Sequence, residues 1–125
     1  MTNQEIAEML KKVSSAYQIL GENRFRIIAY DRAADSIEHL TSDLKDYWRE
    51  GTLSDVPGVG KTIAEHIDEL YKTGKNAHWE AVFAKVPEAV FPLLLVPGIG
   101  PKKAHALVTI LGLKHEKTAV LDLEK

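Results

Sequence analysis

The segment VPGVGKTIAEHI at residues 56–67 recurs as VPGIGPKKAHAL at residues 96–107, forty residues further along the chain. Each copy places a Pro-Gly pair, a hydrophobic residue and a second glycine at the start of a predicted helix. Backbone N–H groups in such a turn, and at the helix N-terminus that follows it, point outward and bind phosphate. Two copies in one small protein therefore indicate a surface that grips a polymer with repeating phosphates, which is nucleic acid.

The two turns supply the candidate phosphate donors. Gly58 and Gly60 permit positive φ and put no side chain between backbone and ligand, while Val59 is expected to turn inward and hold the two flanking helices together. A tight turn between helices with no ligand is the alternative for a single copy, and the repetition with lysines after each copy favours binding. The candidate phosphate-binding residues are Gly58, Gly60, Lys61, Thr62, Gly98, Gly100, Lys102 and Lys103.

Composition limits the class of protein. The chain has 125 residues, of which 45% are hydrophobic and 27% charged, as in an ordinary globular domain. It has no cysteine, which excludes disulfides and cysteine-type zinc sites. The five histidines lack the spacing of a metal site, so we expect no zinc and no organic cofactor. There is neither a membrane-length apolar run nor a signal-peptide core, so we expect a cytoplasmic protein without a membrane partner.

Charge is distributed unevenly. The net charge of −2 argues mildly against nucleic-acid binding, and acidic residues crowd the stretch from 35 to 55. Residues 89–115 contain no acidic residue, whereas Lys102, Lys103 and Lys114 fall there. Arg24 and Arg26 begin a second basic group. We therefore expect a bipolar molecule with phosphate contacts confined to a few positions.

The whole chain is predicted to be all-α, a bundle of helices joined by short turns. Apolar residues follow the helical period from residue 6 to 20 and again from 27 to 40. Gly21 ends the first of these helices, Asn23 caps the second, and Gly74 ends the helix that follows the first turn. Trp79 belongs to a further helix and is expected in the core. No segment shows the alternation of a strand.

Three stretches resemble family X DNA polymerases, the group that includes DNA polymerase beta. LSDVPGVGKTIAEHIDELYKTGK (53–75) and LLLVPGIGPKKAHALVTILG (93–112) are similar to the two helix-hairpin-helix motifs of that family. ENRFRIIAYDRAADSIEHL (22–40) is similar to the second helix of its N-terminal lyase-type domain. The resemblance covers nearly the whole chain. It implies a lyase-type helical domain with the first motif at residues 1–75 and a second-motif segment at 76–125, packed together.

The resemblance also implies a division of labour. In that family the N-terminal domain binds the 5′-phosphate side of a DNA gap, and the second motif grips the primer-side strand. A 5′-phosphate pocket would involve Arg26, Tyr30, Lys61 and His66, although Tyr30 is otherwise an ordinary core aromatic and Arg26 a solvated helix residue. A monovalent cation, Na⁺ or K⁺, would be held at the hairpins by the backbone carbonyls of Ser54, Val56, Val59, Leu94, Val96 and Ile99.

Two departures bear on activity. His66 stands where active lyases of the family have the lysine that forms a Schiff base, and imidazole cannot form that imine. Lys61 or Lys72 would be only weak substitutes. The polymerase palm is also missing, because no Gly-Ser followed by a D-x-D pair occurs. We therefore expect no polymerase activity from this chain alone. The resemblance favours a fragment or split product of a DNA-directed DNA polymerase, and the alternative is a stand-alone DNA-binding module derived from one.

The leading hypothesis is a monomeric module that binds gapped or nicked DNA without sequence preference, as the N-terminal part of a family X polymerase in base excision repair. In a prokaryote we expect it at the nucleoid. One alternative is a lyase that acts on 5′-deoxyribose phosphate or abasic sites. The other is a protein-interaction scaffold that has lost its affinity for DNA, which the acidic net charge favours slightly.

Overall fold

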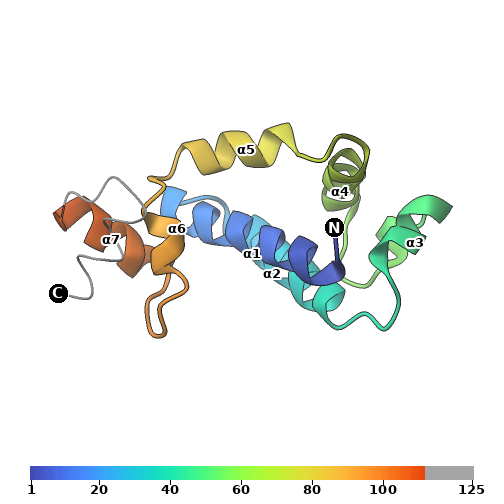
Figure 1. Ribbon diagram of the computed structural model, residues 1–125, viewed down its shortest axis with the longest axis horizontal. Helices are drawn as coiled ribbons and strands as arrows, with labels where there is room; N and C mark the ends of the chain where they lie inside the picture. The colour runs from blue at the N-terminus through green and yellow to red at the C-terminus, as the bar shows by residue number, and fades with distance from the viewer. Residues whose placement is uncertain (112–125) are drawn as a thin grey trace.

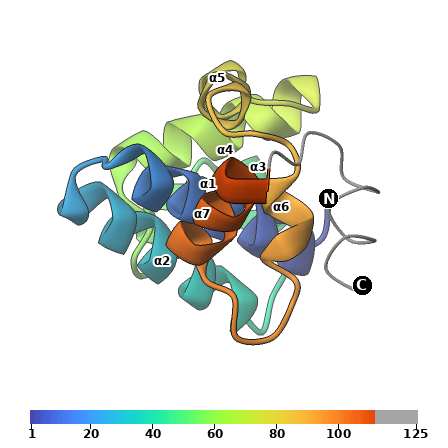
Figure 2. The ribbon, with the colours of Figure 1, turned by 90° about the vertical axis from the view of Figure 1, so that its left-hand side faces the viewer.

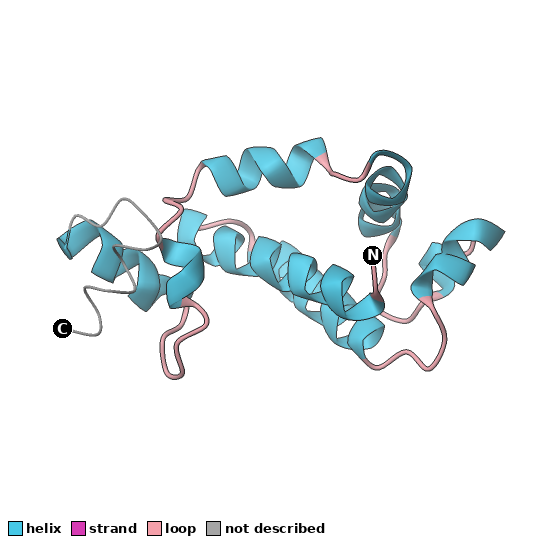
Figure 3. Cartoon of the chain, in the orientation of Figure 1, coloured by secondary structure: helices cyan, strands magenta, loops and turns pink. Residues whose placement is uncertain are grey.

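The computed structural model describes residues 1–111, and within that range the chain is all-helical, with no strand (Figure 3). This confirms the predicted fold class. The sequence also predicts that Gly112 ends the last helix and that a short helix or loose turn follows from residue 116, and both lie outside the described residues. The elements are α1 (Asn3–Leu20), α2 (Arg24–Glu38), α3 (Leu44–Glu50), the 3-10 helix η1 (Leu53–Asp55), α4 (Lys61–Thr73), α5 (Ala77–Ala84), α6 (Val90–Leu93) and α7 (Pro101–Leu111).

Helices α1 and α2 form an antiparallel pair through the centre of the molecule (Figure 1). Thr2 and Glu5 form a capping box at the start of α1, and Gly21 ends the helix with φ 71°. Asn23 then caps α2 by accepting the N–H of Phe25 at 2.7 Å. The short turn between these caps fixes the two helices side by side, so that each buries its apolar face against the other.

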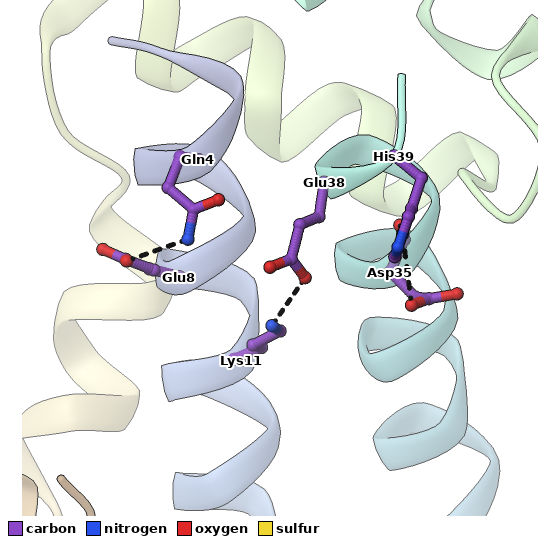
Figure 4. Close-up of polar contacts among 6 residues, drawn as sticks. All are labelled: Gln4, Glu8, Lys11, Asp35, Glu38 and His39. Atoms are coloured by element: carbon purple, nitrogen blue, oxygen red, sulfur yellow. Dashed lines mark hydrogen bonds and ion pairs between the residues drawn. The ribbon is translucent and has the colours of Figure 1, made fainter. Parts of the chain in front are cut away.

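Ion pairs and hydrogen bonds between polar side chains lie on the solvent-exposed side of α1 and α2. The Lys11 ammonium lies 2.7 Å from the Glu38 carboxylate and links α1 to α2 (Figure 4). The other pairs drawn there lie within one helix each and are Gln4–Glu8 and Asp35–His39. Exposed pairs of this kind contribute little to stability, so burial of apolar side chains carries the fold.

The remaining helices surround this pair and share its core. Helix α5 runs lengthwise above α1. Helices α3 and α4 lie toward one end, and α6 and α7 lie at the other (Figures 1 and 2). Trp79 of α5 is 1% exposed, as expected for a core residue, and Ala104 and Val108 of α7 join the same hydrophobic cluster. Segments on both sides of residue 76 therefore bury apolar side chains together. None of the helices in residues 1–111 combines the length and apolarity that crossing a bilayer requires.

Candidate nucleic-acid interface

The first hairpin loop, residues 56–60, is a tight turn between η1 and α4. The N–H of Val59 donates to the Val56 carbonyl at 3.0 Å, and Gly58 has φ 82°. Proline followed by glycine at positive φ is the pattern of a type II turn. Gly60 has φ −80° and ψ 174°, so the expectation of positive φ there is wrong: it is the extended N-cap of α4. Its carbonyl accepts the N–H of Ala64 at 2.9 Å.

The second hairpin loop, residues 96–100, repeats this geometry between α6 and α7. The N–H of Ile99 donates to the Val96 carbonyl at 3.1 Å, and the N–H of Ala104 donates to the Gly100 carbonyl at 2.9 Å. Gly98 has φ 84°, and it is the one positive-φ glycine of this loop. Matching bond for bond at an offset of forty residues, the two loops are one structural unit used twice.

Both loops present backbone N–H groups at a helix start. No side chain caps the N-terminus of α4, and the first amides of any α-helix lack intrahelical partners. The two loops lie toward opposite ends of the molecule (Figure 1). The surface exposes all eight predicted phosphate-binding residues, which are Gly58, Gly60, Lys61, Thr62, Gly98, Gly100, Lys102 and Lys103.

Of the carbonyls that the family resemblance assigns to a cation, four belong to the two loops, and those of Ser54 and Leu94 come just before them. Those of Val56 and Val96 each accept one turn N–H, and because a carbonyl oxygen has two lone pairs each retains one for a further partner. Oxygen-only donors suit hard cations. Carbonyl oxygens are thus of the right kind for the monovalent cation that the family resemblance implies, for which Ser54, Val59, Leu94 and Ile99 would supply the other oxygens.

A hollow of about 540 Å³ lies beside the first loop, bounded by α1, α2, α4 and the start of α5. Arg26, Tyr30, Lys61 and His66 all line it. The sequence predicted these four as one group from the family resemblance alone, and the structure brings them together from two helices thirty or more residues apart. Lys61 and Arg26 supply positive charge at the rim, where both are exposed, and the Arg26 guanidinium lies 3.4 Å from the Glu22 carboxylate.

Tyr30 forms the floor of this hollow. It is 4% exposed, and burial raises the pKa of its hydroxyl to about 12, so the hydroxyl stays protonated at neutral pH. Its oxygen accepts the indole N–H of Trp79 at 3.0 Å and lies 3.1 Å from Nδ1 of His66. Tyr30 is therefore both a core aromatic and part of the hollow, so the interpretation as a core residue is compatible with the interpretation as a pocket residue.

Three further residues of the hollow escaped the sequence analysis. Tyr17 and His78 are hydrogen-bonded to each other at 2.8 Å, between hydroxyl and Nε2, and no periodicity relates two positions 61 residues apart. Phe25 is 83% exposed at the rim. An aromatic residue between Arg24 and Arg26 was the sequence signal that could have found it, since basic residues with an interleaved aromatic suit nucleic acid.

Asn76 joins α4 to the start of α5, the helix that carries His78. It is 2% exposed, its amide donates to the His66 carbonyl at 3.1 Å, and its side-chain oxygen accepts the N–H of Trp79 at 2.9 Å. One buried side chain thus ties the middle of α4 to the start of α5. Two residues after Asn76, the imidazole of His78 stacks on that of His66, with ring centroids 4.9 Å apart and planes inclined by 17°.

The two lysines considered as substitutes for a Schiff-base lysine are placed differently. Lys61 lines the hollow. Lys72 does not, and its ammonium lies 3.0 Å from the Asp68 carboxylate, which also accepts the indole N–H of Trp48 at 2.8 Å. Trp48 stacks on Tyr71 at 5.0 Å and is half-buried, as a core-edge residue.

Comparison with known proteins agrees with this geometry. The helix-hairpin-helix domain model matches residues 1–76. A DNA polymerase/3′-5′ exonuclease PolX of Bacillus subtilis (strain 168) is 31% identical over 112 residues, which are 90% of this chain. A DNA polymerase lambda of Arabidopsis thaliana is 32% identical over 108 residues, 84% of this chain. The chain spans 19% of the length of each and matches their N-terminal part.

Proposed function

We propose that this chain, which belongs to the helix-hairpin-helix domain family, binds DNA through its two hairpin loops without reading base sequence, as the N-terminal part of a family X DNA polymerase. The observation that carries this proposal is the duplicated loop, with its exposed first-turn amides and adjoining lysines. Amides and lysines contact phosphates, which position a protein on DNA but carry no sequence information.

The hollow beside the first loop supports a finer proposal, that the chain prefers DNA with a gap or nick. A 5′-phosphate that enters the hollow would meet the charges of Arg26 and Lys61 and the imidazole of His66. Phe25 at the rim offers a flat apolar face for an unpaired base, an arrangement that favours single-stranded DNA. Continuous duplex offers neither a terminal phosphate nor an unstacked base.

Polymerisation enters the proposal through the names of the relatives, and repair enters it through the resemblance to family X polymerases. Both relatives are named DNA polymerases, and this chain corresponds to about a fifth of their length. We propose that it docks a polymerase of this family onto gapped DNA during repair in the cytoplasm. A monovalent cation at each loop would neutralise phosphate charge where a side chain is too bulky.

A lyase activity is not supported to the same degree. His66 occupies the position of the Schiff-base lysine, and Lys72 is paired with Asp68 outside the hollow. Among the lysines of residues 1–111, Lys61 alone lines the hollow. Borohydride reduction in the presence of DNA with a 5′-deoxyribose phosphate tests this directly, because a covalent adduct that disappears in Lys61→Ala would establish a lyase.

Fluorescence anisotropy with short labelled duplexes tests the binding proposal. We expect binding to a one-nucleotide gap with little dependence on sequence and a slope of log affinity against log salt of about −3 to −4, for about four phosphates. A 5′-phosphate in the gap is expected to tighten binding. No binding at low salt would overturn the proposal and favour the scaffold alternative. Equal affinity for gaps with and without a 5′-phosphate would leave the proposed binding through the loops standing and would exclude the proposed preference for a 5′-phosphate.

A further inference from the structure

The stacked imidazoles of His66 and His78 are an uncommon feature of the hollow. Each ring is anchored through one nitrogen, since Nδ1 of His66 contacts the Tyr30 hydroxyl and Nε2 of His78 contacts the Tyr17 hydroxyl. Within residues 1–111, the structure gives no partner to the other nitrogens, Nε2 of His66 and Nδ1 of His78. Both rings line the hollow. Each therefore keeps one nitrogen available to a ligand.

Protonation decides what these free nitrogens can do. A neutral imidazole has one donor and one acceptor nitrogen, whereas a protonated ring donates from both. Adding a proton therefore guarantees that the nitrogen left free is a donor, which is what a phosphate oxygen needs. The same proton costs energy in the empty hollow, because two stacked rings at 4.9 Å cannot both become charged without repulsion.

The surroundings favour the neutral form of His66 until an anion arrives. Burial, and then the neighbouring His78, lowers the pKa of His66, while Glu69 and Glu65 oppose this shift. Arg26 and Lys61 add positive charge around the same hollow. The charged and titratable groups that face the pair are Tyr17 of α1, Arg26 and Tyr30 of α2, and Lys61, Glu65 and Glu69 of α4.

We propose that the His66–His78 pair takes up a proton from solvent when a terminal phosphate monoester enters the hollow, so that the pair selects DNA ends over internal phosphates. This inference rests on the proposed DNA binding and names His78 as a specificity-determining residue. A terminal monoester carries a charge of about −1.5 to −2 at neutral pH, against one negative charge on an internal phosphate. The larger charge stabilises the proton more, and the preference therefore grows as the pH falls.

The experiment compares gapped duplexes with and without a 5′-phosphate between about pH 6.5 and 8.5, a range in which the phosphate is mostly dianionic because its second pKa is about 6. One linked proton gives up to a tenfold loss of affinity per pH unit as the pH rises. We expect this loss for the phosphorylated gap and a flat profile for the other. Calorimetry at pH 7 in two buffers of different ionisation enthalpy is expected to show net uptake of up to one proton.

Variants separate the pair from other titrating groups. His66→Gln and His78→Gln are each expected to flatten the profile for the phosphorylated gap, while His66→Lys keeps a fixed charge, so phosphate preference persists with little pH dependence. His39→Gln is the matched control, because His39 is exposed and bonds to the Asp35 carbonyl at the end of α2. It is expected to leave the profile unchanged.

The outcomes distinguish this inference from the function on which it rests. A preference for the 5′-phosphate that does not change with pH, or a pH dependence that survives in both glutamine variants, would overturn the proton uptake and leave the phosphate site standing. Absence of any preference for the 5′-phosphate at every pH would remove the site itself. Circular dichroism and melting temperatures of the variants show that the fold is intact in each case.

Discussion

The two hairpin loops share one backbone geometry but have different surroundings. Val56 in the first loop is 1% exposed, whereas Val96 at the same place in the second is 37% exposed. A Cβ on Gly58 would lie 3.1 Å from the Arg32 carbonyl oxygen of α2, whereas a Cβ on Gly98 would meet nothing within 4 Å. The first loop is therefore packed tightly against the central helix pair, whereas the second loop projects from the far end of the molecule.

The helices that follow the loops also bury different faces. Helix α4 buries Ile63, Ile67 and Leu70, whereas α7 buries Ala104 and Val108. At the offset of forty, Ala104 and Val108 correspond to residues 64 and 68, so the buried face of α7 is turned by about one residue. The duplicated segment thus fixes a turn and the start of a helix, while neighbouring elements select the face that enters the core.

The largest difference is expected at one pair of equivalent positions. Leu70 of α4 is 3% exposed and Ile110 of α7 is 79% exposed. Leu70→Ala is expected to lower the free energy of unfolding by about 2–4 kcal/mol, because it leaves a cavity in the core. Ile110→Ala is expected to change it by no more than about 0.5 kcal/mol. Urea denaturation measures both, and equal losses would show that the two helices are packed alike.

The paired glycines provide the next contrast. Alanine at either position must adopt a left-handed backbone conformation, and the strain lowers the free energy of unfolding by about 1 kcal/mol or somewhat more. Gly58→Ala must also displace the Arg32 carbonyl, so we expect a loss of about 2–3 kcal/mol there and about 1 kcal/mol for Gly98→Ala. Thermal and urea unfolding measure the difference. A larger loss in Gly98→Ala would contradict the open environment of the second loop.

Lysine variants divide the DNA contacts between the loops. Lys102→Ala combined with Lys103→Ala is expected to weaken binding about tenfold for every duplex and to reduce the salt slope by about 2. Lys61→Ala is expected to lower the affinity about threefold, mainly for the 5′-phosphorylated gap, because Lys61 lines the hollow. Lys11→Ala removes the same charge from α1 and is expected to leave affinity nearly unchanged. Identical effects of all three changes would indicate nonspecific attraction alone.

The smallest effect is expected in the stability of the fold at low pH, and it involves His66 in the hollow beside the first loop. The folded state holds the pKa of His66 below its ordinary value of 6.5 through burial and the neighbouring His78. The unfolded chain therefore binds a proton more readily, and stability falls as the pH drops below about 6.5. His66→Gln is expected to make the decline shallower in urea titrations at pH 7.5, 6.5 and 5.5.

The pKa of His39 is shifted in the opposite direction to that of His66, and His39 is the control for this measurement. Its pKa is raised by the Asp35 carbonyl and carboxylate, so its contribution is present at low pH and lost as the pH rises. It is fully exposed, and His39→Gln should leave the acid decline in place. The position equivalent to His66 in α7 is Ala106, which cannot titrate. An unchanged decline in His66→Gln would assign acid sensitivity to other groups.

Much of the fold follows from short-range patterns. Gly21, Asn23 and Gly74 end or cap helices where the sequence predicts, because a capping bond and a positive φ depend on residues a few positions away. The same holds for the turns at Gly58 and Gly98. Gly60 was mispredicted because a second glycine looks equally suited to positive φ, whereas an extended N-cap has no need of it.

The candidate site was predictable only in part. Arg26, Tyr30, Lys61 and His66 came together in the sequence analysis through a family resemblance, and spacing alone relates none of them across α2 and α4. His78 gave no such signal, since its ring contacts Tyr17, 61 positions away, and His66 of another helix. The domain boundary near residue 75 remains a prediction.

By itself, the sequence determined the helices, their caps and the shared backbone geometry of the two loops, because local hydrogen bonds and backbone preferences act over three or four residues. Only the tertiary structure decided which loop is packed tightly against the central helix pair, which face of the following helix is buried, and that His66 and His78 stack. Those outcomes depend on contacts such as Tyr17 with His78 and Tyr30 with Trp79, which join residues 61 and 49 positions apart. Burial and charge at the hollow are properties of that packing, and no local pattern specifies them.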